Sequence, residues 1–380
     1  MTNVSEEWLE EAVPYFEFEQ FTSGVRIGTG YFGNACYRNL QWKKRGIYRR
    51  TPSQYVELYK HCLATDPDIR PEAISILETL NRLIANFELA QCKQSNENFT
   101  VNKSLSITKS MGSNIQNEES ITENWLEKAI SDKHINYIEF NKLYKHHCGR
   151  RYRLWKDVEL TVALKVDTSI DEKIIKDFID EFKLLQRVSY HPNIITFYGV
   201  TKDNNGNYNM ILDYANEGTL REYLKTNFTL LQWTDKLRIA KEIALGLLFL
   251  HDKDIIHRDL HSKNIIIHQR QAKITDFGLA KQMNEMSMTS NSIVHGMTAY
   301  IEPQCFIKSR YKRDKRSDVY SFGQILWEIS SGRPPFSSFN LEIYSCFQKA
   351  IIVIHVFQGN REEPIEGTPS IYRTLQKMLG

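Results

Sequence analysis

Two short segments of this chain contain residue types suited to moving a phosphoryl group onto a hydroxyl. The first, residues 257–264, has the sequence HRDLHSKN, and the second begins at Asp276 with DFG. A carboxylate such as Asp259 can accept a hydroxyl proton, whereas the amide of Asn264 and the carboxylate of Asp276 can bind Mg²⁺. Lys263 adds a positive charge that would offset the charge of a phosphate. The spacing of these residues therefore predicts a phosphoryl-transfer site.

The residues between the two segments predict an element that would bring both carboxylates together. Ile265–Ile267 and Lys273–Thr275 have the pattern of short buried strands, and His268–Gln271 has the composition of a turn. Such a hairpin would return Asp276 to the side of Asp259. The alternative is a solvated turn with incidental charges, which the joint spacing makes the weaker interpretation.

Size and composition exclude several classes of protein. The chain has 380 residues, of which 41% are hydrophobic, so it can bury a sizeable core. Its net charge of +3 is too small, and too evenly mixed with acids, to indicate a nucleic acid or a membrane surface as the main partner. The six cysteines include no CxxC pair, which argues against a disulfide framework or a zinc site. We find no secretory signal and no membrane-spanning run, and we expect a cytoplasmic protein.

The chain contains duplicated material. Trp8–Ala12 is echoed by Trp125–Ala129, and Thr51–Tyr55 is echoed by Thr368–Tyr372. The echoes mark the beginnings and ends of two units, of about 80 and about 260 residues, so the first unit has lost its middle. The polar stretch between the units cannot bury enough apolar surface to offset its ordering entropy. We expect a truncated fragment at residues 1–90, a flexible linker at 91–120 and a main domain at 121–380.

Hydrophobic periodicity predicts a small sheet-rich part followed by a larger helical part. We expect a helix near 123–130, strands around 150–166, a helix near 171–189, strands near 194–201 and 207–213, and helices at Leu237–His251 and Val319–Ser330.

Residues 140–380 resemble a protein kinase domain. The resemblance rests on the two segments above, on VALK at Val162–Lys165 and on Glu181 within a downstream helix. By this resemblance, residues 257–264 correspond to the kinase catalytic loop. The basic residue of this loop follows Asp259 by four positions instead of two, which resembles the tyrosine-kinase-like group, whose members mostly phosphorylate serine and threonine. The resemblance implies an α+β bilobal fold with a small antiparallel-sheet lobe and a larger helical lobe, preceded here by the short duplicated kinase fragment.

The resemblance also implies how ATP would be bound. Lys165 would grip the α- and β-phosphates, and Glu181, preferred over Asp180, would pair with this lysine. Leu212 would be the gatekeeper, or simply a core residue. The residues implied to contact the nucleotide and its metal are Gly149, Ala163, Lys165, Leu212, Asp213, Ala215, Asn264 and Asp276, with the hinge at 213–215.

By the same resemblance Asp259 would be the catalytic base, Asn264 and Asp276 the Mg²⁺ ligands, and Lys263 the group that stabilises the transferring phosphoryl. The implied function is a protein kinase that uses ATP and Mg²⁺ to phosphorylate a serine or threonine of a protein substrate in intracellular signalling. One alternative is a weakly active or inactive pseudokinase scaffold. Another is a truncated product that does not fold stably.

Three departures from the kinase pattern support these alternatives. Upstream of Lys165 only Gly149 remains of a glycine-rich loop, whose backbone should approach the phosphates. The family's Ala-Pro-Glu is replaced by Glu302-Pro303-Gln304, so an amide stands where a glutamate normally pairs with a late arginine. The chain also reaches Gly380 before the expected Asp-Pro-x-x-Arg-Pro segment, so we expect a large lobe without its last helices.

Both missing parts occur in the first unit, as a glycine loop at Ile27–Ala35 and as DPDIRP at Asp66–Pro71. They could complete the main domain in cis. About nine residues join Trp42 to Thr51, however, and these span at most ~32 Å, less than the ~45 Å width of such a domain. We therefore favour a remnant of a second kinase that packs poorly or on its own.

Residues 279–301 have the length of an activation loop and contain several hydroxyl side chains. Arg258 could pair with a phosphate on this loop and order it. A merely solvated loop is the alternative, and the sequence leaves both open.

Overall fold

The structure is a computed structural model that describes residues 51–92, 123–132, 134–145, 152–166, 172–282, 297–308, 311–337 and 345–363. These residues belong to two compact units. The sheet unit is drawn from Arg82–Ser189 and Thr196–Tyr214, and the helical unit from Met1–Asn81, Tyr190–Ile195 and Ala215–Gly380. The expected α+β class, with a sheet-containing part and a larger helical part, is confirmed.

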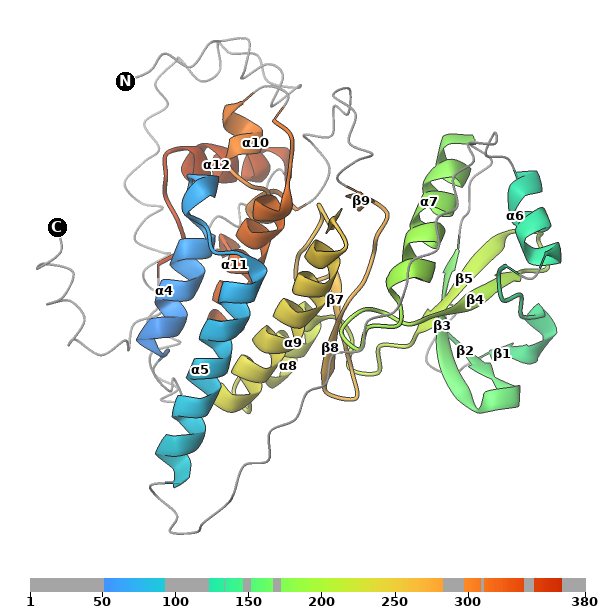
Figure 1. Cartoon of the computed structure of the whole chain (residues 1–380), viewed down its shortest axis with the longest axis horizontal. Helices are drawn as coiled ribbons and strands as arrows, with labels where there is room; N and C mark the ends of the chain where they lie inside the picture. The colour runs from blue at the N-terminus through green and yellow to red at the C-terminus, as the bar shows by residue number, and fades with distance from the viewer. Residues whose placement is uncertain are drawn as a thin grey trace, which may run out of the picture. The chain divides into compact units, whose positions relative to one another are not determined.

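The sheet unit contains a five-stranded antiparallel sheet in the order β1-β2-β3-β5-β4 (Figure 1). The strands are β1 (Leu143–Lys145), β2 (Tyr152–Trp155), β3 (Leu160–Val166), β4 (Phe197–Lys202) and β5 (Tyr208–Asp213). The unit also contains two helices, α6 (Glu123–Ser131) and α7 (Glu172–Val188), and two 3-10 turns, η2 (Phe140–Lys142) and η3 (Lys156–Val158).

Alternation along β3 decides which side chains enter the core of the sheet unit. Val162 and Leu164 are buried in one cluster with Ile138, Leu143 and Ile211. Because successive side chains of a strand point to opposite faces, Lys165 leaves the sheet on the other face. The apolar burial on one side of β3 therefore fixes the direction of its lysine.

The helical unit surrounds one long buried helix, α11 (Lys315–Ser331). Its N-cap residue Asp314 accepts a hydrogen bond from the Arg316 N–H, and its last turn ends at Gly332, whose φ of 70° suits glycine. All residues from Ser317 to Ser331 are buried, which is typical of a helix enclosed on every side.

The other described elements of this unit either contact α11 or are linked to it by packing against one another (Figure 1). The helices are α8 (Leu220–Asn227), α9 (Trp233–Asp252), α10 (Gln304–Ile307), α12 (Ser345–Phe357) and the 3-10 turn η5 (Thr298–Tyr300). The strand pairs are β6 (Ile255–Ile256) with β9 (Lys281–Gln282), and β7 (Ile265–His268) with β8 (Gln271–Ile274). The β7–β8 pair lies against α8 and α9.

Residues 51–81 also belong to the helical unit. They form α4 (Ser53–Cys62), the 3-10 turn η1 (Pro67–Ile69) and the first part of α5 (Ala73–Cys92). Helix α4, drawn in blue, packs against α11, drawn in orange-red, although some 260 positions separate them (Figure 1). The expectation that residues 1–90 pack poorly or on their own is therefore wrong for residues 51–81.

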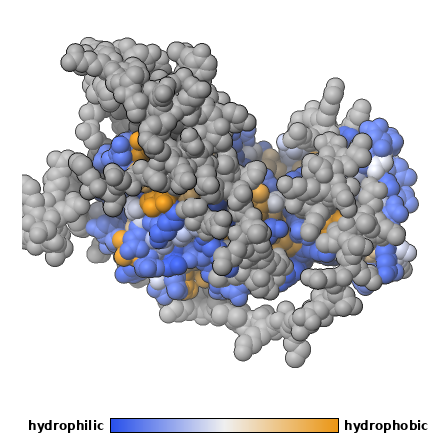
Figure 2. Space-filling view, turned by 90° about the horizontal axis from the view of Figure 1, so that it is seen from above, coloured by the Kyte–Doolittle hydropathy of each residue, from blue (hydrophilic) through white to orange (hydrophobic). Residues whose placement is uncertain are grey.

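The predicted helices and strands of the main domain occur close to their expected positions, with β2 and β3 taking the place of the strands around 150–166. The glycine loop at Ile27–Ala35 and the proposed linker at 91–120 lie almost wholly outside the described residues. Within the part of the chain that is described, no helix has the length and apolar character needed to cross a bilayer. Hydrophilic residues cover most of the described surface that is visible in Figure 2.

A glycine substitution tests the join between β4 and the segment that precedes β1. Gly199 has a φ of 145°, and a Cβ there would lie 2.2 Å from the Asn136 carbonyl oxygen, which accepts a hydrogen bond from the Val200 N–H. We expect Gly199→Ala to lower the free energy of unfolding by roughly 1–3 kcal/mol, as overpacking does. The measurement is thermal and urea unfolding. Gly206→Ala, which meets no atom within 4 Å, is the control and should cost less.

Candidate active site

The predicted hairpin after the catalytic loop is present in the helical unit. Strands β7 and β8 pair from Ile265 opposite Ile274 to His268 opposite Gln271. The turn residues Gln269 and Arg270 both have positive φ, which is typical of a tight two-residue hairpin. At the open end, the Thr275 N–H donates to the Asn264 carbonyl oxygen at 3.0 Å. The hairpin therefore returns the chain to the catalytic loop just before Asp276.

Asp259 and Asn264 contact each other directly. The Asn264 Nδ2 donates to the Asp259 carbonyl oxygen at 2.9 Å and to its Oδ2 at 3.3 Å. Burial raises the pKa of the Asp259 carboxyl; His257 and Asn264 oppose this shift, and the charge of Asp276 adds to it. A carboxylate with a raised pKa is a better proton acceptor, which suits the role predicted for Asp259.

The backbone of this loop is held by a buried carboxylate on α11. Asp318 is 1% exposed, and its oxygens accept hydrogen bonds from the His257 N–H at 2.8 Å and the Arg258 N–H at 2.9 Å. His251 Nε2 lies 3.2 Å from Asp318 Oδ2. Burial alone would raise the pKa of Asp318, but its hydrogen bonds and the nearby histidines lower it below the ordinary value. The charged form is thus the one that the fold stabilises.

Two non-glycine residues of the site have positive φ, Arg258 at 68° and Asp276 at 64°. Such conformations are costly and persist only where the surroundings enforce them. The Asp318 oxygens supply this restraint at Arg258. Beside Asp276, the Phe277 ring packs 5.1 Å from the His257 ring, whose Nε2 lies 3.1 Å from the Thr275 carbonyl oxygen.

In the sheet unit, Lys165 and Glu181 form the predicted ion pair. The Lys165 Nζ lies 2.6 Å from Glu181 Oε1 and 2.8 Å from Oε2. Glu181 is 6% exposed, because the flanking residues Ile179 and Phe182 of α7 enter the core. The pairing uses Glu181, as the register with the following leucines indicates. The ammonium group of Lys165 is therefore held by both oxygens of a buried carboxylate.

The remaining predicted nucleotide-contacting residues have varied environments. Leu212 is buried and Ala163 is half-buried, and the two are opposite each other on β5 and β3. The Asp213 N–H donates to the Thr196 carbonyl oxygen at 3.1 Å, so this donor is already used within the sheet unit. Ala215, half-buried, accepts from the Gly218 N–H at 3.2 Å.

Two further predicted residues contribute less to the described geometry. Lys263 is exposed and lies between the buried Ser262 and Asn264; its charge lowers the pKa of Glu222, secondary to hydrogen bonds from Thr219. Gly149 lies outside the described residues, as do residues 283–296 of the expected activation loop.

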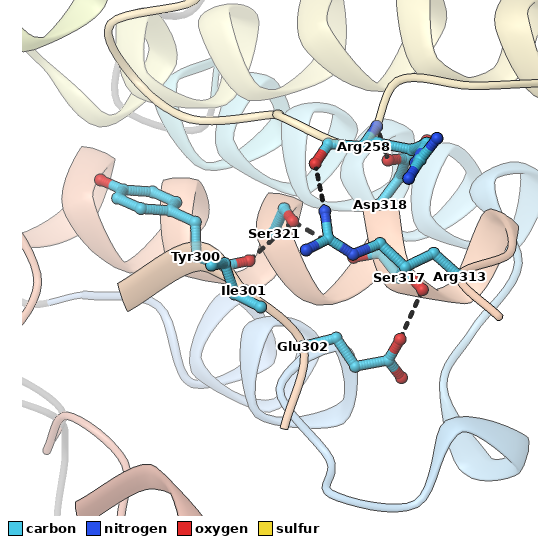
Figure 3. A pocket seen from close by; sticks show the side chains of 8 residues that line it. All are labelled: Arg258, Tyr300, Ile301, Glu302, Arg313, Ser317, Asp318 and Ser321. Atoms are coloured by element: carbon cyan, nitrogen blue, oxygen red, sulfur yellow. Dashed lines mark hydrogen bonds between the residues drawn. The ribbon is translucent and has the colours of Figure 1, made fainter. Parts of the chain in front are cut away.

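A small pocket adjoins the catalytic loop within the helical unit (Figure 3). It is lined by Arg258, Tyr300, Ile301, Glu302, Arg313, Ser317, Asp318 and Ser321. The Arg313 Nη1 donates to the Arg258 carbonyl oxygen at 2.8 Å. Burial lowers the pKa of Arg258, and the nearby charge of Arg313 adds to this effect. Two guanidinium groups therefore lie close to the end of the expected activation loop.

The replacement of Ala-Pro-Glu by Glu302-Pro303-Gln304 does not remove the buried ion pair. Glu302 Oε1 lies 2.5 Å from the Arg70 Nη1, and both side chains are completely buried. Arg70 is the arginine of the DPDIRP segment in the first unit. An amide does stand at position 304, as the sequence indicates, but the ion pair is kept because a carboxylate two positions earlier, Glu302, forms it.

Comparison with known proteins identifies the family. A sequence profile of the family described as protein tyrosine and serine/threonine kinase matches residues 132–377. The chain belongs to this family. It is 32% identical over 183 residues to a probable leucine-rich-repeat receptor-like serine/threonine-protein kinase of Arabidopsis thaliana, covering 47% of this chain and 19% of the relative.

Two other kinases are similarly related. A putative serine/threonine-protein kinase/receptor of Acanthamoeba polyphaga mimivirus is 32% identical over 189 residues, covering 49% of this chain and 11% of the relative. The human dual specificity testis-specific protein kinase 2 is 36% identical over 173 residues, covering 44% of this chain and 29% of the relative. The chain thus spans less than a third of the length of these kinases. Their names agree with the expected tyrosine-kinase-like group.

One polar network of this kinase domain was not predicted from the sequence. The Arg221 Nε donates to Glu328 Oε1 and to Ser262 Oγ, both at 3.0 Å, and its Nη2 donates to the Tyr300 hydroxyl at 2.6 Å. Tyr300 in turn donates to Glu328. The network joins the catalytic loop to the segment before Glu302. Because Arg221 and Glu328 are 107 positions apart, no local sequence pattern predicts that they pair.

Asp318 provides a pH-dependent test of how the catalytic loop is supported. We expect Asp318→Asn to lower the free energy of unfolding at pH 7 by roughly 1–3 kcal/mol, because an amide N–H₂ would face backbone donors. The folded pKa of Asp318 lies below its unfolded value of about 4, so its stabilisation is complete above that pH and is lost as the pH falls further. The difference between the two proteins should therefore shrink below about pH 4.

Urea unfolding at pH 7 and at pH 3.5 measures both effects. The control is Asp254→Asn, which breaks only an exposed pair with Lys315 and should cost less than about 1 kcal/mol. An equal effect of both substitutions at pH 7 would contradict the role given to Asp318.

Proposed function

We propose that this chain is a protein kinase that transfers the γ-phosphoryl group of ATP to a serine or threonine hydroxyl of a protein substrate. The observation that carries the proposal is the contact between Asn264 and Asp259, beside a hairpin that returns Asp276 to the same loop. A carboxylate with a raised pKa and an oriented amide on one rigid loop suit phosphoryl transfer, in which positioning supplies most of the rate.

The contacts and exposure of Lys165, Asp259 and Lys263 suit the role proposed for each. Lys165, held by both oxygens of Glu181, would present its ammonium group to the α- and β-phosphates. Asp259 would accept the proton of the substrate hydroxyl as that oxygen attacks the γ-phosphorus. The exposed Lys263 would approach the transferring phosphoryl from the catalytic loop. The intact Lys165 pair and the held Asp259 support an enzyme over an inactive scaffold.

The donor set fits a hard divalent cation such as Mg²⁺. Asn264 uses its Nδ2 on Asp259, so its Oδ1 is directed elsewhere and can serve as an oxygen ligand. Asp276 adds a carboxylate, and phosphate oxygens commonly complete such sites. Among the described residues no group of three or more His, Cys, Asp or Glu side chains could hold a metal. When bound, Mg²⁺ would neutralise charge on the β- and γ-phosphates.

The proposed substrate and setting follow from the family. A protein with serine or threonine acceptors is proposed because two of the relatives above are named serine/threonine-protein kinases. We propose that the chain acts in the cytoplasm, in signalling by phosphorylation, with neither a nucleic acid nor a membrane as its main partner.

Substitutions in each unit test phosphoryl transfer. We expect Lys165→Met, Asp259→Asn and Asp276→Asn each to reduce autophosphorylation with MgATP by roughly 100-fold or more, because each removes a charge that acts on the phosphates or the nucleophile. The measurement is incorporation of labelled phosphate, together with the melting temperature of each variant.

Two substitutions of exposed residues serve as controls. Lys202→Met removes a surface lysine of the sheet unit that pairs with Glu127, and Asp254→Asn removes a surface carboxylate of the helical unit. Both should retain activity. Equal phosphate incorporation by every variant would reject the enzyme and favour a scaffold. The same holds if the unaltered chain incorporates no phosphate although its melting curve shows that it is folded.

The acceptor residue is a separate prediction. We expect phosphoserine and phosphothreonine after acid hydrolysis of the autophosphorylated chain. The reason is that the lysine stands four positions after Asp259, as in the tyrosine-kinase-like group, whose members mostly use these acceptors. Asp276→Asn provides the control for a co-purifying kinase. Phosphotyrosine in a comparable amount would instead indicate dual specificity, the term in the name of the human relative.

A further inference from the structure

Helix α11 has a surface shaped for α4. A Cβ on Gly323 would lie 2.7 Å from the Cys62 Cβ and 3.0 Å from two atoms of the Leu63 side chain. The Tyr55 hydroxyl donates to the Leu326 carbonyl oxygen at 2.9 Å, and its ring meets Trp233 of α9 edge-on at 5.2 Å. A close approach that only glycine allows, next to a buried tyrosine, is typical of the inside of a domain.

The turn after α4 is joined to the same unit by a buried charge. Besides Glu302, Arg70 contacts the carbonyl oxygens of Ala64 at 2.8 Å and Arg316 at 3.0 Å. Glu302 also accepts from Ser317 and, at 3.2 Å, from Tyr311. Both charges are thus fully enclosed and hydrogen-bonded. Removing either would leave the other buried without its partner, which is the costly case for an ion pair.

The amide at position 304 fits this arrangement. The Gln304 Nε2 donates to the Thr65 carbonyl oxygen at 3.0 Å. A glutamate at this position could not donate at neutral pH and would place a carboxylate against a carbonyl. From the other end of the unit, Arg361 donates to the Leu63 carbonyl oxygen and to Thr65 Oγ1, both at 2.9 Å. Three separate segments of the helical unit therefore bind the turn that follows α4.

We infer that residues 51–81 are the terminal part of the large kinase lobe, contributed to that lobe by the N-terminal side of the same chain. Helix α4 and the DPDIRP turn occupy the surface of α11, and Arg70 is a positioning residue for Glu302. This assignment concerns folding and does not depend on phosphoryl transfer by the chain.

A second segment of the chain, residues 368–380, is an alternative candidate for the surface of α11 that α4 covers. Residues 368–380 echo residues 51–63, and Tyr372 and Leu375 correspond to the buried Tyr55 and Leu58. At four other buried positions the echo differs: Arg373 corresponds to Val56, Gln376 to Tyr59, Leu379 to Cys62 and Gly380 to Leu63. Among the described residues, 51–81 supply both the apolar face that packs on α11 and the cation that pairs with Glu302.

The test cuts the folded full chain between its two parts. A site for a specific protease is inserted between Lys109 and Ser110, and the cleaved protein is examined by size-exclusion chromatography with light scattering. We expect the two fragments to remain together with the mass of one chain. Separation of the fragments under native conditions would overturn the assignment.

Substitutions at the interface make the test specific. Arg70→Ala should weaken association of the cleaved fragments by at least ~100-fold, as loss of one partner of a buried ion pair does. Gln304→Glu should weaken it as well. The control is Lys60→Ala, which removes an exposed cation from α4 and should leave association unchanged. If Arg70→Ala and Lys60→Ala behave alike, Arg70 does not hold the segment.

Two further measurements separate the other occupants. Deletion of residues 368–380 from the uncut chain should leave the melting temperature unchanged; a large fall would assign the surface to the later copy instead. The uncut chain should elute with the mass of a monomer at all concentrations. A dimer that dissociates on dilution together with loss of stability would show that a second copy supplies the segment, and would overturn the assignment to the same chain.

Discussion

The candidate catalytic loop depends on one buried carboxylate. Asp318 accepts the backbone N–H groups of His257 and Arg258, and the second of these residues has a left-handed backbone conformation that an isolated chain would disfavour. Because the carboxylate belongs to an enclosed helix, its hydrogen bonds restrain the loop backbone relative to the core. Asp259 is the next residue, so its position relative to Asn264 follows from this restraint.

Helix α11 contacts both the catalytic loop and α4, two parts of the chain that no single sequence motif connects. One side of α11 supplies Asp318 to the catalytic loop, whereas Gly323 and Leu326 meet α4 from the distant N-terminal part of the chain. A helix that is buried throughout has no spare solvent-facing side, so loss of α4 would expose apolar surface at about 25 cal/mol per Å². The stability of the catalytic loop is thereby linked to residues 51–81.

Local patterns predicted much of the site, and long-range pairings were missed. The β7–β8 hairpin and the Lys165–Glu181 pair follow from strand alternation and helix register, which act over a few residues. The Arg70–Glu302 pair joins positions 232 apart, and no local pattern indicates which acid an arginine will meet. The length of the segment from Trp42 to Thr51 limits only the joint docking of the glycine loop and the DPDIRP turn. Docking of the turn alone makes no demand on that segment, so chain length did not predict it.

The altered Ala-Pro-Glu motif shows how an apparent defect can be compensated. A buried arginine requires a carboxylate within hydrogen-bonding distance, but its position in the sequence can vary if the backbone allows it. Here the acid stands at Glu302, where Ser317 and Tyr311 also donate to it, and Gln304 turns its amide to a backbone carbonyl that only a donor can satisfy. The charges of Arg70 and Glu302 and the Gln304 Nε2 each have a partner, whereas the buried Gln304 Oε1 has none among the described residues. Whether its charges are paired is therefore a better criterion for this segment than whether its residues are identical to those of the Ala-Pro-Glu motif.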